Sequence, residues 1–327
     1  MFCQLDLTIL HIIVLSLYKI NPLSMLSILI PTYEYDCTRL VLTLFEQAAA
    51  LKQTLKDHFD FEILVADDAS PDKAYLSAFE KMQAEGKCRF FALKENLGRA
   101  KIRNFLASQA QYDYLLFIDC DALVCTDDFI KQYWDARHKG NVVCGALRNL
   151  EVCPPGGELR YTYEKAAEKQ RPANVRAQNP YAYFTTFNVM FERKVFAHLL
   201  FDERCTEYGY EDALMGLMLE HEGHTIAHID NPLVHNGIDQ SAVYLDKIET
   251  SLRVLHRLGD PLQSASALVR LKRRLQSAGL LFIVRFLYKN FSDNMRCNLL
   301  SPKPSMLILK LYKLGYYAGL EAIDEGK

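Results

Sequence analysis

The sequence predicts an α/β fold in which a mainly parallel sheet is flanked by helices and followed by a C-terminal helical extension. Between residues 26 and 234, short apolar runs alternate with segments whose apolar residues recur at helical spacing. The run Tyr114–Ile118 is apolar throughout, as is typical of a central strand in a parallel sheet. After residue 240 only helical patterns follow, and basic residues interrupt them. These observations indicate one doubly wound domain with an appendage.

The expected elements follow one another in the order of such a fold. Strands are predicted from short apolar runs at residues 26–31, 61–65, 88–93, 114–118, 141–147, 181–191 and 225–234. Helices are predicted from three- and four-residue apolar spacing at residues 38–57, 73–85, 97–109 and 213–222. Residues 161–177 are charged and are expected to be helical or mobile. Because sheets of this kind bind ligands beyond the carboxyl ends of their strands, the site is expected there.

The composition excludes several classes of protein. Half of the 327 residues are hydrophobic and 24% are charged, which excludes wholesale disorder, collagen-like repeats and a polytopic membrane protein. The net charge of −2 gives no reason to expect nucleic acid as a partner. Residues 1–244 carry 24 basic and 33 acidic side chains, whereas residues 245–327 carry 14 basic and 7 acidic ones. The two parts are therefore expected to face different partners.

The ends of the chain are expected to lie outside the central domain. Residues 1–24 are apolar but contain Asp6, with no basic segment before them and no small-residue cleavage site after them. They are expected to be either an extension from a miscalled start codon or a membrane-proximal segment. We therefore divide the chain into this extension, a domain at 25–240 and a helical extension at 241–327. The nine scattered cysteines form no Cys-x-x-Cys pair, which indicates reduced thiols in a cytosolic protein.

Polar residues gather where three of the expected strands end. These ends carry Pro31-Thr32-Tyr33-Glu34, Asp67-Asp68-Ala69-Ser70 and Asp119-Cys120-Asp121. Carboxylates are scarce beside apolar runs because burying them unpaired is costly. Two strand ends that each carry a pair of carboxylates therefore predict a bound cation or several bound hydroxyl groups.

Five segments taken together resemble family 2 glycosyltransferases of the GT-A fold. In chain order they are SILIPTYEYD, ILVADDASPD, ENLGRAKIRN, the apolar strand that leads into DCD, and GYEDALMG. Each is weak alone, but five in the expected order, each at the expected strand end, make a specific signal. Glu34 departs from the pattern, in which Asn usually follows the Tyr. The resemblance implies an inverting enzyme that transfers a sugar from a nucleotide-sugar donor to a hydroxyl acceptor.

The Asp-Cys-Asp segment is expected to hold a divalent cation. The diphosphate of the donor must be neutralised as the glycosyl bond breaks, and a cation held by Asp121, with Asp119 nearby, would act as the Lewis acid. Oxygen ligands and phosphate suit Mg²⁺ or Mn²⁺. By resemblance, His235 would complete the metal site. The alternatives are that Asp119 caps the next helix or turn and that His235 is structural.

The first two strand ends are expected to bind the nucleotide. By resemblance, Asp67 would contact the base or the ribose, with Asp68 beside it. The same face carries Pro31, Thr32 and Tyr33, and Tyr33 would form a wall for the base. The alternative for Tyr33 is a packed aromatic ring, and for Asp68 it is the closure of a turn.

Two further segments, the loop at Ser70 and the helix that carries Lys101 and Arg103, contain residues with a structural as well as a binding interpretation. Ser70 is expected to cap the helix that follows it. By resemblance, Arg103 would lie near the diphosphate, at a helix whose N-terminus adds positive charge. Lys101 on the same helix is expected to be a solvated charge.

The pair Glu211 and Asp212 is expected to provide the catalytic carboxylates. Inverting transfer needs a carboxylate that takes the proton from the attacking hydroxyl on the face opposite the leaving group. By resemblance, Asp212 is that base and Glu211 supports the acceptor or the donor sugar. The alternative is two acids favourably placed in a first helical turn.

The basic tail is expected to be helical and to lie at a membrane surface. Two apolar runs at 280–289 and 306–317 are punctuated by basic residues, and neither is long enough to span a bilayer. Basic amphipathic helices suit an interfacial position on an anionic cytoplasmic membrane. We therefore expect a cytoplasmic protein peripheral to the inner face of a bacterial cell membrane, with a lipid-linked or surface glycan as acceptor. The alternative is a helical cap on the catalytic domain.

Two other classes of protein agree less well with the sequence than a glycosyltransferase does. A sugar-1-phosphate nucleotidyltransferase uses a related sheet and D-x-D metal, but it would carry a Gly-rich, Arg-containing loop where this sequence has PTYEYD. A non-catalytic nucleotide-sugar-binding module would be expected to lose the metal or base carboxylates, yet Asp121 and Asp212 are present.

Overall fold

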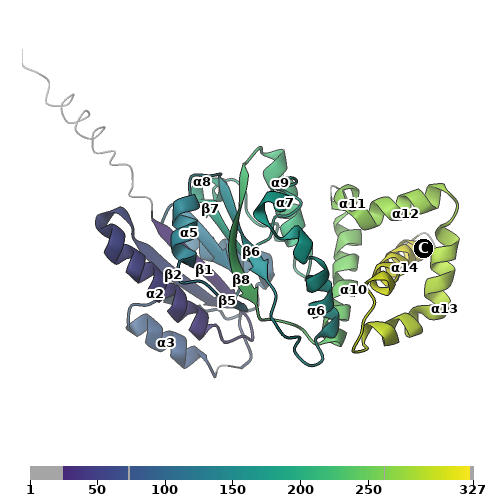
Figure 1. The fold of residues 1–327 in the computed structure, drawn as a ribbon, viewed down its shortest axis with the longest axis horizontal. Helices are drawn as coiled ribbons and strands as arrows, with labels where there is room; N and C mark the ends of the chain where they lie inside the picture. The colour runs from purple at the N-terminus through teal and green to yellow at the C-terminus, as the bar shows by residue number, and fades with distance from the viewer. Residues whose placement is uncertain (1–24, 73, 261, 325–327) are drawn as a thin grey trace, which may run out of the picture.

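The computed structural model describes residues 25–72, 74–260 and 262–324, with only the backbone described at 321–324. The predicted extension at 1–24 lies outside the described residues. The chain forms one eight-stranded mixed sheet with helices on both faces, and a group of helices follows it (Figure 1). The predicted α/β architecture with a C-terminal helical region is therefore confirmed.

The first half of the domain is a parallel βα unit, as predicted. Its strands are β1 (Leu26–Thr32), β2 (Phe61–Asp67), β3 (Arg89–Ala92) and β4 (Tyr114–Ile118). Its helices are α2 (Thr38–Leu55), the short η1 (Lys56–His58), α3 (Leu76–Ala84) and α4 (Gly98–Gln109). The strands lie in the order β3-β2-β1-β4, all parallel. Their carboxyl ends therefore meet at one edge of the sheet.

The second half mixes strand directions, so the doubly wound parallel arrangement does not extend across the whole sheet. Its strands are β5 (Ala122–Val124), β6 (Val142–Arg148), β7 (Asn188–Glu192) and β8 (Ile226–His235). Its helices are α5 (Phe129–Ala136), α6 (Glu158–Ala166), η2 (Glu168–Gln170), α7 (Ala173–Arg176), α8 (Arg193–Phe196) and α9 (Glu211–His221). Strand β7 runs antiparallel to β4 and β6, and β5 runs antiparallel to β8.

The strand predicted at 181–191 is shorter than expected. Only its last part is β7, because the chain before Asn188 turns so that Thr185 and Thr186 bind the carboxylate of Asp212. Asn188 fixes the start of the strand, since its side chain accepts a hydrogen bond from Tyr133 and donates one to the carbonyl of Ala146. The residues before Asn188 are aromatic and favour a strand, but they form a turn because the turn allows the polar contacts with Asp212.

The sheet is buried on both faces, which explains the continuous apolar runs. In β1, Ile28 packs with helices α2, α3 and α5, while Leu29 points to the other face with α4, α8 and α9. Figure 1 shows α2, α3 and α5 together on one side of the sheet. The strand ends emerge from this rigid core.

The C-terminal region consists of helices alone. They are α10 (Ser241–Leu258), α11 (Leu262–Ala265), α12 (Ala267–Ser277), α13 (Leu281–Leu299) and α14 (Met306–Asp324). Helix α10 packs against α6 and α14, and its Tyr244 and Leu252 share one hydrophobic cluster with Leu29 of the sheet. The first helix of the predicted extension is thus part of the core. Within the described residues, no helix combines the length and apolarity that crossing a membrane requires.

Candidate functional site

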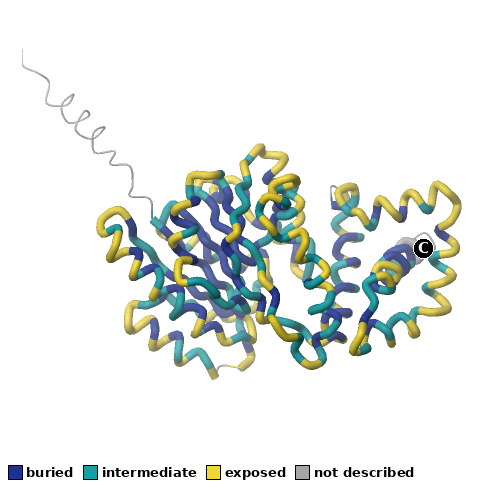
Figure 2. The backbone as a smooth tube through the Cα atoms, in the orientation of Figure 1, coloured by how far each residue is buried: buried dark blue, intermediate teal, exposed yellow. Residues whose placement is uncertain are grey.

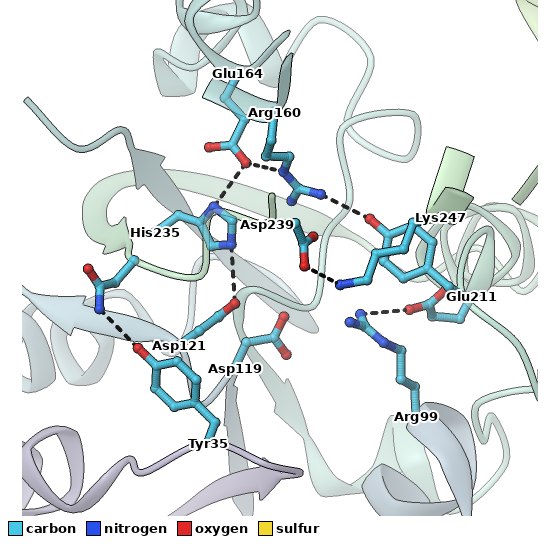
Figure 3. A network of polar contacts seen from close by, with 12 residues as sticks. Tyr35, Arg99, Asp119, Asp121, Arg160, Glu164, Glu211, His235, Asp239 and Lys247 are labelled. Atoms are coloured by element: carbon cyan, nitrogen blue, oxygen red, sulfur yellow. Dashed lines mark hydrogen bonds and ion pairs between the residues drawn. The ribbon is translucent and has the colours of Figure 1, made fainter. Parts of the chain in front are cut away.

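The carboxyl-end edge of the sheet brings together carboxylates, a histidine and an arginine from four elements (Figure 3). Asp119 and Asp121 lie in the turn between β4 and β5, and His235 is the last residue of β8. Glu211 begins α9 and Arg99 lies in the first turn of α4. Figure 3 shows these five side chains around one site. The structure thus unites most of the residues predicted for metal binding and catalysis.

His235 lies between two carboxylates. Its Nε2 is 3.2 Å from Oδ2 of Asp121, and its Nδ1 is 2.9 Å from Oε1 of Glu164 on α6. Burial by itself lowers the pKa of His235, but the two carboxylates outweigh it and raise that pKa to about 9. Burial likewise opposes the charged form of Asp121, yet the contact with His235 holds the pKa of Asp121 below its usual value. The pair is therefore charged at neutral pH, and the imidazole must release a proton before it can ligate a cation.

The pair Asp121 and His235 fits a shared cation site. Oδ1 of Asp121 is buried and has no hydrogen-bond partner among the described residues. Gly237 leaves room at this carboxylate, since a Cβ there would lie 2.0 Å from Oδ2 of Asp121. No group of three or more His, Cys, Asp or Glu side chains within the described ranges is arranged to hold a metal ion. Two protein ligands still suit a cation whose remaining ligands are phosphate and water.

Asp119 is engaged by Arg103. Nη2 of Arg103 lies 2.7 Å from Oδ1 of Asp119, and the arginine side chain is almost wholly buried. The guanidinium also lies over the ring of Phe201, 5.6 Å from its centroid. Arg103 therefore compensates the charge of Asp119 from within the protein. Lys101 on the same helix is exposed, as predicted.

Arg99 is an accessible cation at this edge, and sequence reasoning assigned it no role. Its side chain is 47% exposed, and Nη1 lies 3.4 Å from Oε1 of Glu211. The guanidinium stacks over the ring of Tyr208 at 4.9 Å. Burial opposes the charge, but Glu211 and the neighbouring carboxylates raise the pKa of Arg99, so it stays charged.

Asp212 is a carboxylate held in a defined orientation. Its Oδ1 accepts a 2.7 Å hydrogen bond from the Thr186 hydroxyl, and its Oδ2 accepts bonds from the Thr185 hydroxyl and the Thr186 amide. Burial and the nearby charge of Glu211 raise the pKa of Asp212 to about 6. A carboxylate with this pKa is mostly ionised at neutral pH and is a stronger base than an ordinary one.

The two acids of the β2 end are anchored inside the protein. Asp67 is fully buried, and its Oδ1 accepts a 2.5 Å hydrogen bond from the Ser70 hydroxyl. Asp68 accepts hydrogen bonds from the amides of Leu97 and Gly98, which ties the N-terminus of α4 to β2. The prediction that Ser70 caps a helix is wrong. Helix α3 starts only at Leu76, and Ser70 instead binds Asp67 within the loop.

The β1 end forms a tight loop with one exposed aromatic ring. Pro31 pairs with Ala66 in the sheet, and the Thr32 hydroxyl donates a 2.7 Å hydrogen bond to the Tyr35 carbonyl. Tyr33 is exposed, which leaves its ring available to a ligand. Glu34 adopts a left-handed backbone with φ of 49°, and its amide donates to Ser70. The loops after β1 and β2 therefore support each other.

Four side chains at the site were given no role by sequence reasoning. Arg160 and Glu164 lie one turn apart on α6, 2.5 Å between Nε and Oε1. Arg160 also donates to the hydroxyl of Tyr208, and Lys247 of α10 lies 5.5 Å from the centroid of the same ring. The four-residue spacing of Arg160 and Glu164 is the one sequence feature that indicates their ion pair. Nothing in the sequence indicates that they meet His235, Tyr208 or Lys247.

Known proteins resemble this chain in sequence. An uncharacterised glycosyltransferase, YfnE of Bacillus subtilis, is 27% identical over 246 residues, which cover 61% of each chain. The hyaluronan synthase of Pasteurella multocida is 25% identical over 247 residues, which cover 63% of this chain and 25% of the synthase. The chain therefore aligns with less than two thirds of the length of either relative.

The fold resembles that of a solved glycosyltransferase. The mannosyltransferase PcManGT from Pyrobaculum calidifontis, solved in complex with GDP-Man and Mn²⁺, matches with a TM-score of 0.56 at 14% identity. The match covers 91% of this chain and 86% of that one. It supports the GT-A fold that the five segments implied. Residues 27–200, more than half of the chain, match the family described as "Glycosyl transferase family 2". The chain belongs to glycosyl transferase family 2.

Proposed function

We propose that the protein transfers a sugar from a nucleotide-sugar donor to a hydroxyl acceptor with inversion, aided by a divalent cation. The observation that carries the proposal is the convergence of two kinds of group at one edge of the sheet. One is the Asp121 and His235 pair, and the other is the basic carboxylate of Asp212. A cation site and a base on separate elements are what this transfer needs.

Asp121 and His235 would hold Mg²⁺ or Mn²⁺, and Asp119 would lie close to the cation. When bound, the cation supplies Lewis acidity that neutralises the charge of the departing diphosphate. Glu164 orients the imidazole of His235 from its far side through the 2.9 Å contact at Nδ1. The buried Arg103 holds the carboxylate of Asp119 in place through the 2.7 Å contact. The Mn²⁺ in the PcManGT complex supports a divalent cation here.

Asp212 would take the proton of the attacking hydroxyl. The hydroxyls of Thr185 and Thr186 and one amide hold the carboxylate in place, and burial raises its basicity. Glu211, paired with Arg99, would contact the acceptor or the donor sugar. The exposed half of Arg99 would meet the anionic donor, because its guanidinium is accessible at this edge.

The loops after β1 and β2 would bind the nucleotide. Tyr33 offers an exposed ring to the base, whereas the fully buried Asp67 would support the base or ribose site by fixing the loop through Ser70. Asp67, Asp68, Pro31 and Thr32 also set the shape of the loop through their contacts within it. The GDP-Man bound to PcManGT supports a nucleotide-sugar donor.

The acceptor is proposed to be a lipid-linked or surface glycan of a bacterial cell. The similarity to a hyaluronan synthase supports polysaccharide synthesis as the setting. We also propose a cytoplasmic location with peripheral association at the inner face of the membrane through residues 245–327. The basic composition of that segment supports this location.

A panel of nucleotide sugars tests the proposal. We expect at least one donor to raise the melting temperature and to be hydrolysed slowly in the presence of Mg²⁺ or Mn²⁺, with hydrolysis abolished by EDTA. The Asp212→Asn variant should retain donor binding and lose sugar transfer. If no donor stabilises the protein or is hydrolysed, or if Asp212→Asn turns over normally, the proposal is wrong.

A further inference from the structure

Helix α13 presents an apolar face that no described part of the protein covers. Only Leu281 and Leu299 of its 19 residues are buried. One side packs on α14, where Tyr288 contacts the rings of Tyr312 and Tyr316. Figure 2 shows that most of α13 is exposed, in contrast to the strands of the sheet.

The exposed side of α13 is apolar in its first half. Phe282 and Phe286 lie one turn apart and are 67% and 60% exposed. The large exposed hydrophobic side chains of this segment, which we name the α13 patch, are Leu280, Phe282, Ile283, Phe286, Leu287 and Phe291. Spacings of three and four positions, as between Ile283 and Phe286 or Phe282 and Phe286, make them neighbours on the helix surface. Clustered exposed phenylalanines are uncommon on a protein that has no partner.

The chain on either side of the α13 patch is strongly basic. Residues 267–313 contain ten basic side chains and a single acidic one, Asp293. Lys289 lies three positions after Phe286, and Arg274 is in the last turn of the preceding helix. Among the described residues, no acidic side chain forms an ion pair with Arg274, Lys289, Lys303 or Lys310. The patch therefore fits an anionic partner.

We infer that the α13 patch is a docking surface for an anionic lipid bilayer. The phenylalanines would enter the boundary between headgroups and acyl chains while the basic side chains meet the phosphates. A two-fold contact with a second copy fits less well, because it would place the same basic segments against each other. This inference rests on the proposed membrane association and assigns it to a definite surface. It does not depend on the sugar-transfer chemistry.

Flotation of the full chain with phospholipid vesicles tests the inference. We expect binding to vesicles of phosphatidylcholine with about one third phosphatidylglycerol, and at least tenfold weaker binding to pure phosphatidylcholine. The double variant Phe282→Ser/Phe286→Ser should lose at least tenfold in binding to the anionic vesicles. Arg274→Glu/Lys289→Glu should lose a similar factor and become insensitive to salt.

Leu200→Ser is the matched control, since it removes a half-exposed leucine far along the chain from the patch. It should bind vesicles like the parent protein. Circular dichroism and the melting temperature of each variant establish that it is folded. The inference is overturned if the parent protein does not float with anionic vesicles, or if the phenylalanine variant binds them equally well. It is also overturned if light scattering shows that this variant breaks a dimer of the parent protein.

Discussion

At the scale of single residues, the raised pKa of Asp212 predicts how the activity depends on pH. The base must be ionised, and burial together with Glu211 raises its pKa to about 6. We expect kcat/KM to fall tenfold per pH unit below about pH 6 and to level off above it. Initial rates measured at saturating cation across pH 4.5–8 would check this. A rate that stays level down to about pH 4.5 would contradict the role of Asp212.

The same pKa predicts that Asp212 lowers the stability of the folded protein. A folded-state pKa of about 6, above the usual 3.8, means that the charged form is disfavoured by folding. The destabilisation is absent below about pH 4, grows as the pH rises through 6, and reaches at most about 3 kcal/mol. Asp212→Asn should therefore raise the melting temperature at pH 8, and the gain should shrink at pH 4. An equal or lower melting temperature at pH 8 would argue against it.

Glu34 carries backbone strain that another residue would relieve. Its φ of 49° lies in the left-handed region, which Asn tolerates better than Glu. This explains physically why Asn is the usual residue at this place in the family pattern. Glu34→Asn should increase the free energy of unfolding by up to about 1 kcal/mol. Urea unfolding would measure this, with Glu95→Asn as a control at an exposed loop position. A loss of stability specific to Glu34→Asn would contradict the strain.

At the scale of elements, the loop after β8 approaches the turn after β4 so closely that only glycine fits. A Cβ on Gly237 would lie 2.0 Å from Oδ2 of Asp121, so Gly237→Ala must displace that carboxylate from His235. We expect the cation concentration for half-maximal activity to rise 10- to 100-fold, with little change in the melting temperature. Gly319→Ala is the control, because nothing lies within 4 Å of a Cβ there. An unchanged cation requirement in Gly237→Ala would argue against the site.

Backbone strain concentrates in the loops that surround the candidate site. Among the described residues, four positions other than glycine have positive φ, and three of them are Glu34, Ala69 and Tyr210. These residues lie after β1, after β2 and directly before α9. Strained conformations of this kind persist only where the surrounding structure enforces them, and they recur at functional sites. The elements thus fix the loop that carries Tyr33 and the loops that adjoin Asp67 and Glu211.

At the scale of the whole molecule, α10 joins the helical extension to the catalytic domain through a shared core. Leu252 is fully buried in the cluster that also contains residues of the sheet and of α14. Leu252→Ala should lower the free energy of unfolding by about 2–5 kcal/mol. Unfolding should remain a single transition when followed by circular dichroism and by the fluorescence of Trp134 in the sheet domain. Two separate transitions would show that the extension is an independent unit.

Local sequence patterns determined seven of the eight described strands, the longer helices and the carboxylates at the strand ends. Periodicity and turn residues act over a few positions, so β4 was predicted at Tyr114–Ile118 without error. The short β5 and helix α5 were missed, because three to eight residues give too little periodicity. The lengths of α6 and α7 were left open for the same reason.

Only the tertiary structure decided which side chains meet. The contact of His235 with Asp121 joins residues 114 positions apart, and that of Arg99 with Glu211 joins residues 112 positions apart. No local pattern encodes such a pairing, because it follows from the order in which strands enter the sheet. The sequence by itself determined that carboxylates end these strands. The fold determined that Arg103 pairs with Asp119, that Glu164 contacts His235 and that burial raises the pKa of Asp212, since each depends on chain segments far apart in the sequence.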